Sequence, residues 1–142
     1  MIEERANYQL VRVAKLHGVL VGGQLAKLGL HIGQELLLSQ LWRQDGLTQS
    51  ELIGRLRVEA PTVTKALQRL ERAGMVRRER HPGNRRVWRV FLTDKGRALE
   101  APVKQVWADS ERQLLSGLSA EERDRVRALL DRMIANLETH LV

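Results

Sequence analysis

Residues 48–92 constrain the fold most strongly, because helix start and stop signals follow one another there at short intervals. Thr48-Gln49-Ser50-Glu51 has the form of a capping box, in which the Thr hydroxyl and the Glu carboxylate satisfy backbone donors at a helix start. That helix is predicted to end near Leu56, and Arg57-Val58-Glu59 then makes a brief connection. Pro61 suits the first turn of a second helix, where its missing N–H costs nothing. The spacing predicts two helices joined by a tight turn.

A β-hairpin is expected directly after these helices. The second helix should reach Ala73-Gly74, and residues 75–80 and 86–92 are expected to be extended, with the β-favouring Val87, Trp88, Val90 and Phe91 in the second stretch. His81-Pro82-Gly83-Asn84 between them is typical of a turn. Because an isolated two-stranded ribbon is only marginally stable, it must pack against the helices beside it. The segment is therefore predicted to form a winged helix-turn-helix.

Further helices are predicted on both sides of this segment. Thr93 should cap a long helix that Pro102 kinks, and Ser119 with Glu122 forms a second capping box for the last helix. The approximate helical ranges are 5–28, 33–44, 93–117 and 119 onward. The predicted fold class is mainly α with a small two-stranded β-wing, without linkers or repeats.

The positive charge lies in the middle of the chain. The net charge is +7, and residues 43–100 hold 14 Lys or Arg against 7 Asp or Glu, so the excess is confined to them. A basic centre between electrically balanced ends indicates a polyanion-binding module on a neutral scaffold. The alternative is a solvated basic face with no partner.

Several classes of protein and site are disfavoured by what the sequence lacks. Without cysteine there are no disulfides, thiolate metal sites or thiol redox chemistry. The four histidines form no short ligand pair, so no metal or other cofactor is expected. The most apolar stretch, residues 18–26, is too short to span a bilayer, and a cytoplasmic protein without a membrane partner is expected. The sequence contains no phosphate-binding loop and no nucleophile elbow, so an enzyme is not expected.

The outward face of the second helix and the hairpin carry the candidate contacts to double-stranded DNA. A helix fits the width of the major groove, where hydroxyl, amide and guanidinium groups meet base edges and phosphates. Arg85 or Arg86 at the hairpin tip could enter a minor groove, whereas Lys65 and Arg72 are expected at phosphates. Alternatively, the arginines only solubilise an exposed ribbon edge. The candidate residues are Thr48, Gln49, Pro61, Thr62, Thr64, Lys65, Gln68, Arg69, Arg72, Arg78, Arg85 and Arg86.

Four stretches, in this order and at this spacing, resemble the MarR family of bacterial transcriptional regulators. The stretches are Leu47–Leu52, Val63–Val76, Asn84–Arg86 and Leu92–Gly96. The resemblance implies a single domain over residues 1–142, with a DNA-binding lobe at about 33–100. It also implies an obligate homodimer whose dimerisation helices lie at about 1–32 and 101–142, acting on a pseudo-palindromic promoter site, usually as a repressor.

The apolar pattern of the last predicted helix agrees independently with a dimer. A small chain could hardly bury so broad a stripe alone, although an intramolecular core is the alternative. The stripe comprises Val126, Leu129, Leu130, Met133, Leu137 and Leu141.

The hairpin tip departs from the family pattern. The family usually has Asp-x-Arg there, and this chain has Asn84-Arg85-Arg86. Arg86 matches the family's DNA-contacting arginine, but Asn84 can replace only a hydrogen bond of the acid and not an ion pair.

The resemblance further implies a small aromatic or phenolic effector, bound between the dimerisation helices and the DNA-binding lobe. The side chains suited to such a cleft are His17, Gln24, His31, Trp42 and Trp107. Each of them could instead be structural, because buried His and Trp normally find local partners. Two rival functions remain: an architectural, non-specific DNA binder and a winged-helix module for protein contacts.

Overall fold

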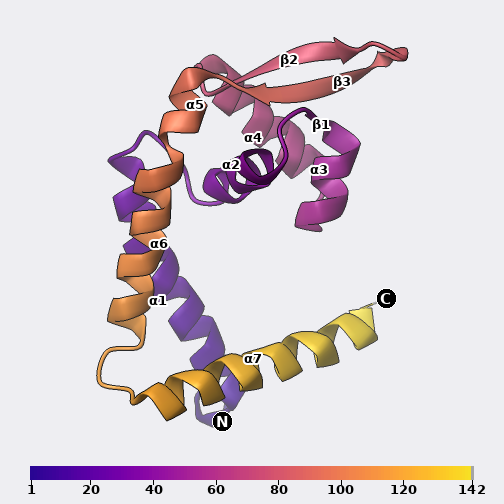
Figure 1. Cartoon of the computed structure of the whole chain (residues 1–142). Helices are drawn as coiled ribbons and strands as arrows, with labels where there is room; N and C mark the ends of the chain where they lie inside the picture. Colours follow the sequence, from indigo (N-terminus) through magenta and orange to yellow (C-terminus); the bar gives the residue numbers. More distant parts are fainter. Residues whose placement is uncertain (142) are drawn as a thin grey trace. The chain divides into compact units, whose positions relative to one another are not determined.

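The computed structural model describes residues 1–141 (Figure 1). The chain divides into two units, Met1–Ala108 and Asp109–Val142, and Val142, the expected end of the C-terminal dimerisation region, lies outside the described residues. The elements in chain order are η1 (Ile2–Glu4), α1 (Ala6–Ala26), α2 (Gln34–Arg43), β1 (Leu47–Thr48), α3 (Gln49–Leu56), α4 (Ala60–Arg72), β2 (Val76–His81), β3 (Asn84–Leu92), α5 (Asp94–Ala98), α6 (Glu100–Leu114) and α7 (Ala120–Leu141).

The mainly helical class with a β-wing is confirmed, but the sheet has three strands where two were predicted. The antiparallel order is β1-β3-β2, with Leu47 opposite Val90 and Thr48 opposite Arg89. Gly46 turns the chain into β1 with a φ of 76°, and its N–H donates to the Val90 carbonyl at 3.0 Å. The β2–β3 hairpin is called the wing from here on.

The predicted helix-turn-helix is confirmed as α3 and α4. The capping box forms: the Glu51 N–H donates to Thr48 Oγ1 at 3.1 Å, and the Thr48 N–H donates to Glu51 Oε1 at 3.3 Å. Arg57 ends α3 in the left-handed region, with a φ of 52°, which turns the chain sharply into α4. Pro61 lies in the first turn of α4.

The long helix predicted over residues 93–117, with a kink at Pro102, is interrupted at Leu99 between α5 and α6 and ends at Leu114. Leu99 itself keeps right-handed helical angles, with φ −79° and ψ −13°. Pro102 cannot donate a hydrogen bond to the Ala98 carbonyl, and its ring would clash with that group, so the helical hydrogen bonding is disrupted there, as the predicted kink implies. Both predicted caps are confirmed, because Thr93 Oγ1 accepts from the Gly96 N–H at 3.2 Å and Ser119 exchanges bonds with Glu122 at 2.9 and 3.1 Å.

The hydrophobic core of the unit Met1–Ala108 lies between the helices and the base of the wing. Figure 1 shows α2, α3 and α4 gathered on one side of the sheet. Val63, Leu67 and Leu70 turn one face of α4 into this core, which leaves the opposite face free for polar groups. Other core side chains are Val21, Leu25, Leu37, Leu38, Leu41, Leu52, Val76, Val90, Leu92 and Val103.

Over residues 1–141, none of the helices combines the length and apolar character that crossing a membrane requires. Within the same residues, no cluster of three His, Asp or Glu side chains is suited to hold a metal ion.

Candidate nucleic-acid interface

Two predicted contact residues hold α3 and α4 together. Gln49 Nε2 donates to Thr64 Oγ1 at 2.6 Å, and the Thr64 hydroxyl donates to the Ala60 carbonyl at 3.0 Å. Thr64 thus has both a donor and an acceptor within the protein, and its side chain is half-buried. The pair fixes how α4 projects from α3.

The exposed face of α4 is polar and basic. Thr62, Lys65, Gln68 and Arg69 are all exposed, on the side opposite the buried aliphatic residues. Arg72 donates from Nε to the Gln68 carbonyl at 3.3 Å, which orients its guanidinium along the helix. The helix therefore offers hydroxyl, amide, ammonium and guanidinium donors on one accessible surface.

The remaining predicted contacts on these helices lie at helix starts. Thr48 is half-buried, and its hydroxyl is occupied by the capping box. Pro61 is exposed in the first turn of α4.

Arg78 links the wing to α4. Its Nε and one terminal nitrogen contact the two Glu71 carboxylate oxygens at 3.0 and 3.3 Å, a bidentate ion pair. Its guanidinium also lies over the Trp88 ring, 5.3 Å from the centroid. The sequence suggested a DNA contact for Arg78, and the structure places it against two neighbours within the protein.

The wing tip is closed by hydrogen bonds of its own side chains. The Gly83 N–H donates to His81 Nδ1 at 3.0 Å, and the Arg86 N–H donates to Asn84 Oδ1 at 3.1 Å. The Asn84 side-chain oxygen therefore accepts the hydrogen bond that an Asp carboxylate could accept at this position. Within residues 1–141, the exposed Arg85 and Arg86 side chains make no ion pair, so their charges remain available.

Two wing aromatics, which the sequence did not single out as site residues, each stack with two arginines. Trp88 contacts Arg80 in addition to Arg78, with 4.4 Å from the guanidinium carbon to the ring centroid. On the opposite face of the ribbon, Phe91 lies 4.9 Å from Arg77 and 5.0 Å from Arg89. Alternation of Arg with Trp and Phe along paired strands is the signal that could have revealed these stacks.

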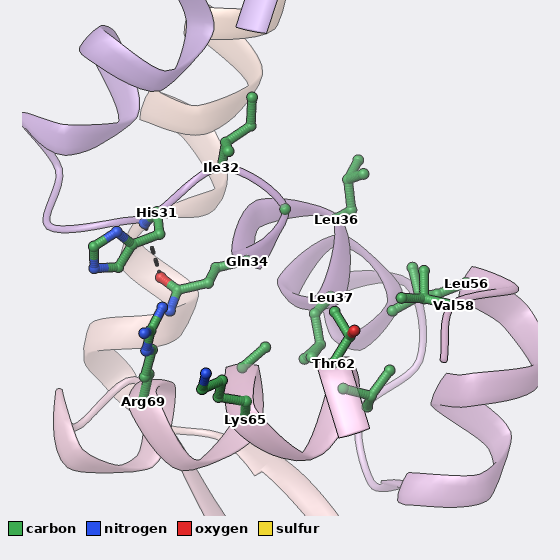
Figure 2. Close-up of a pocket in the computed structure, with 13 residues that line it drawn as sticks. His31, Ile32, Gln34, Leu36, Leu37, Leu56, Val58, Thr62, Lys65 and Arg69 are labelled. Carbon is green, nitrogen blue, oxygen red and sulfur yellow. Dashed lines mark hydrogen bonds between the residues drawn. The ribbon is translucent and has the colours of Figure 1, made fainter. Parts of the chain in front are cut away.

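A cavity of about 280 Å³ lies between α2, the end of α3 and α4 (Figure 2). Its apolar wall includes Leu36, Leu56 and Val58, and Lys65 and Arg69 line it from α4. His31 is the only one of the five predicted effector residues that lines this cavity, and its backbone N–H donates to Gln34 Oε1 at 2.9 Å.

Three other predicted effector residues gather around a smaller cavity of about 160 Å³. Trp42 and Trp107 line this cavity, and the His17 ring lies 5.6 Å from that of Trp107. The buried Glu35, which the sequence did not suggest, accepts a bond from Trp107 Nε1 at 3.2 Å. Gln24 is exposed on α1 and lines neither cavity.

Comparisons with known proteins agree on one family. The MarR family model matches residues 30–88. The HTH-type transcriptional regulator TtmR of Methylorubrum extorquens is 38% identical over 100 residues, which cover 70% of this chain and 49% of TtmR. The chain thus spans about half the length of that relative.

A second relative matches over more of its length. The uncharacterized HTH-type transcriptional regulator YdgJ of Bacillus subtilis is 35% identical over 130 residues, covering 92% of this chain and 77% of YdgJ. Among solved structures, the Staphylococcus aureus MepR–DNA complex has a TM-score of 0.85 at 26% identity, covering 93% of this chain and 98% of MepR.

Proposed function

The chain belongs to the MarR family, and from this premise we propose that it is a homodimeric transcriptional regulator that represses promoters by occluding a pseudo-palindromic DNA site. The observation that carries the proposal is the exposed polar face of α4 beside a wing whose tip holds two unpaired arginines. Both are parts of one module, so a duplex can meet them together. The relatives named as transcriptional regulators and the DNA-bound structural neighbour support the same function.

In this proposal α4 enters the major groove and the wing follows the neighbouring backbone. Thr62, Gln68 and Arg69 would meet base edges or phosphates, and Lys65 would bind phosphate. Arg86 or Arg85 would enter a minor groove, where the negative potential favours a guanidinium. A twofold dimer would present two such modules to half-sites about 34 to 36 Å apart.

Exposed apolar surface on the terminal helices supports the homodimer. On α7, Leu130, Met133 and Leu137 are 40%, 44% and 55% exposed, and no described α7 residue is buried. On α1, Leu16 and Val19 are 61% and 75% exposed. Exposed apolar side chains in this number on each helix are unfavourable in water, and a second copy would cover them.

We also propose modulation by a small aromatic or phenolic effector. The cavity beside α4 combines apolar walls with Lys65 and Arg69, which suits a flat ligand with a negative group. Because both cations also belong to the proposed DNA-contacting face, such a ligand would compete with DNA for their charge. The smaller cavity at Trp42 and Trp107 is the alternative effector site.

The test is fluorescence anisotropy with the duplex upstream of this protein's own gene and a scrambled duplex, at several salt concentrations. The proposal expects at least about a thousandfold weaker binding to the scrambled duplex. Arg69→Ala and Arg86→Ala should each weaken specific binding without unfolding the protein. Arg43→Ala removes the same charge from the exposed end of α2, outside the proposed interface, and should leave affinity unchanged.

Two outcomes would point to the rival functions. Equal, steeply salt-dependent binding to both duplexes would indicate an architectural DNA binder. No binding to either duplex would leave a protein-contact module as the better interpretation. Unchanged affinity in both Arg69→Ala and Arg86→Ala would overturn the assignment of the interface.

A further inference from the structure

A continuous series of side-chain contacts runs from α4 to the wing tip. It begins at Glu71, whose carboxylate holds Arg78 of β2. Arg78 and Arg80 both stack on Trp88 of β3. Arg80 then donates a hydrogen bond to the Arg85 backbone carbonyl, one residue before Arg86. The series thus joins the helix proposed to read the major groove to the arginines proposed to enter the minor groove.

Trp88 occupies the centre of this series because of the strand register. Arg80 lies opposite Trp88 across the ribbon, and Arg78 lies opposite Val90, two residues further along β3. Side chains two residues apart share one face of a strand, so both guanidinium groups reach the same indole. Trp88 is half-buried and lies outside the hydrophobic core.

We propose that Trp88 is a positioning residue that fixes the wing-tip arginines relative to α4 and thereby determines sequence preference where the wing meets DNA. The inference rests on the proposed function. Asn84 carries no charge and cannot orient an arginine by an ion pair. An indole face attracts guanidinium groups without neutralising them, so the wing can be ordered while its cations stay available to phosphates.

The opposite face of the ribbon provides a matched control. Phe91 also stacks with two arginines, but Arg77 pairs there with Glu79, and Arg89 donates from Nε to the Gly46 carbonyl at 3.1 Å. These contacts lead to the base of the sheet, away from the tip. Loss of Phe91 should therefore leave the tip arginines in place.

The experiment compares Trp88→Leu, Trp88→Phe and Phe91→Leu in the full chain. Hydroxyl-radical footprinting of the wild-type complex first locates the minor-groove positions that flank the central half-site. Fluorescence anisotropy then measures affinity for two sets of duplexes. One set is changed from A·T to G·C at the flanking positions, and the other is changed within the central half-site. In Trp88→Leu, the ratio of the affinities for A·T and G·C flanks should fall to about one, which abolishes the flank preference. Discrimination between sequences of the central half-site should be kept. Phe91→Leu should keep both preferences, and Trp88→Phe should largely restore the flank preference.

A second pair of variants guards against a folding defect in Trp88→Leu. Arg80→Met retains apolar packing on Trp88 but loses the guanidinium and its bond to the Arg85 carbonyl, and Arg77→Met removes the same charge from the opposite face. In the free protein, amide hydrogen exchange at residues 83–86 should be about tenfold faster in Arg80→Met than in Arg77→Met. Of these two variants, only Arg80→Met should lower the preference for A·T over G·C at the flanking positions.

The outcomes separate this inference from the function on which it rests. Retained flank preference in Trp88→Leu, equal loss of flank and central discrimination, or equal exchange in Arg80→Met and Arg77→Met would each overturn the role of Trp88 while leaving the regulator intact. A wild-type protein that does not distinguish any of the duplexes would refute the proposed function and this inference with it.

Discussion

Gly96 is the position where one added methyl group should damage the fold most. A Cβ built on Gly96 would lie 2.1 Å from the Met75 carbonyl oxygen. That distance is roughly 1 Å shorter than the closest contacts that Cβ atoms make, so the backbone must move. The Met75 carbonyl cannot move freely, because it accepts the Thr93 N–H at 3.1 Å. On the other side, the Gly96 carbonyl accepts Trp42 Nε1 at 3.0 Å.

The expected cost of Gly96→Ala follows from these contacts. Overpacking against a fixed backbone costs about 2–3 kcal/mol. Weakening of the Thr93–Met75 hydrogen bond costs about 1 kcal/mol more. The better helix propensity of alanine offsets at most about 1 kcal/mol. We therefore expect the free energy of unfolding to fall by about 2–3 kcal/mol.

Urea unfolding followed by circular dichroism, at one fixed protein concentration, measures this change. Gly54→Ala is the matched control, because Gly54 lies in α3 and its added Cβ would meet nothing within 4 Å beyond its chain neighbours and the backbone of its own helix. Alanine there should raise stability by about 0.5–1 kcal/mol. A Gly96→Ala protein as stable as the wild type would refute the steric argument, since no other term opposes the gain in helix propensity.

Three further predictions concern individual polar contacts. Thr48→Ala removes the α3 cap and should lower the free energy of unfolding by about 1 kcal/mol in urea titrations. A double-mutant cycle on the partly exposed Glu71–Arg78 pair should give a coupling of about 0.5–1 kcal/mol. The Ser119 N–H, and to a lesser extent its hydroxyl, lower the pKa of Glu122. The stability this carboxylate contributes should therefore be complete above its ordinary pKa and lost as the pH falls through the lowered value, and Glu122→Gln should abolish that part of the pH dependence of urea unfolding.

The elements with local signals could be predicted from the sequence. Thr48, Thr93 and Ser119 each place a side-chain oxygen where a helix begins, and the structure confirms all three caps. Strand β1 escaped prediction because two residues show no alternation, and Leu47 becomes a strand residue only by pairing with Val90, 43 positions later. At Pro102 the local signal predicts a disrupted helix, and the structure shows the interruption at Leu99.

The candidate site was only partly predictable, because side-chain partners depend on the fold. The basic face of α4 follows from helical periodicity alone. By contrast, the pairing of Arg78 with Glu71 joins a strand to a helix and depends on how the wing leaves α4. The contact of His17 with Trp107 likewise joins residues at opposite ends of the unit Met1–Ala108. The family resemblance suggested that aromatic and histidine side chains could line a shared cavity, but not which of them meet.

The fold also decides where the excess positive charge can act. Some cations of the basic segment form ion pairs within the protein. These pairs include Arg77 with Glu79, Arg78 with Glu71, and Arg97 with both Asp45 and Asp94. Within residues 1–141, Lys65, Arg69, Arg85 and Arg86 are among the cations that make no ion pair, and these four lie exposed on α4 or at the wing tip. Counterions accumulate on DNA phosphates and are released by cations that bind them. The salt dependence of DNA binding should therefore follow these unpaired groups, rather than the net charge of the chain.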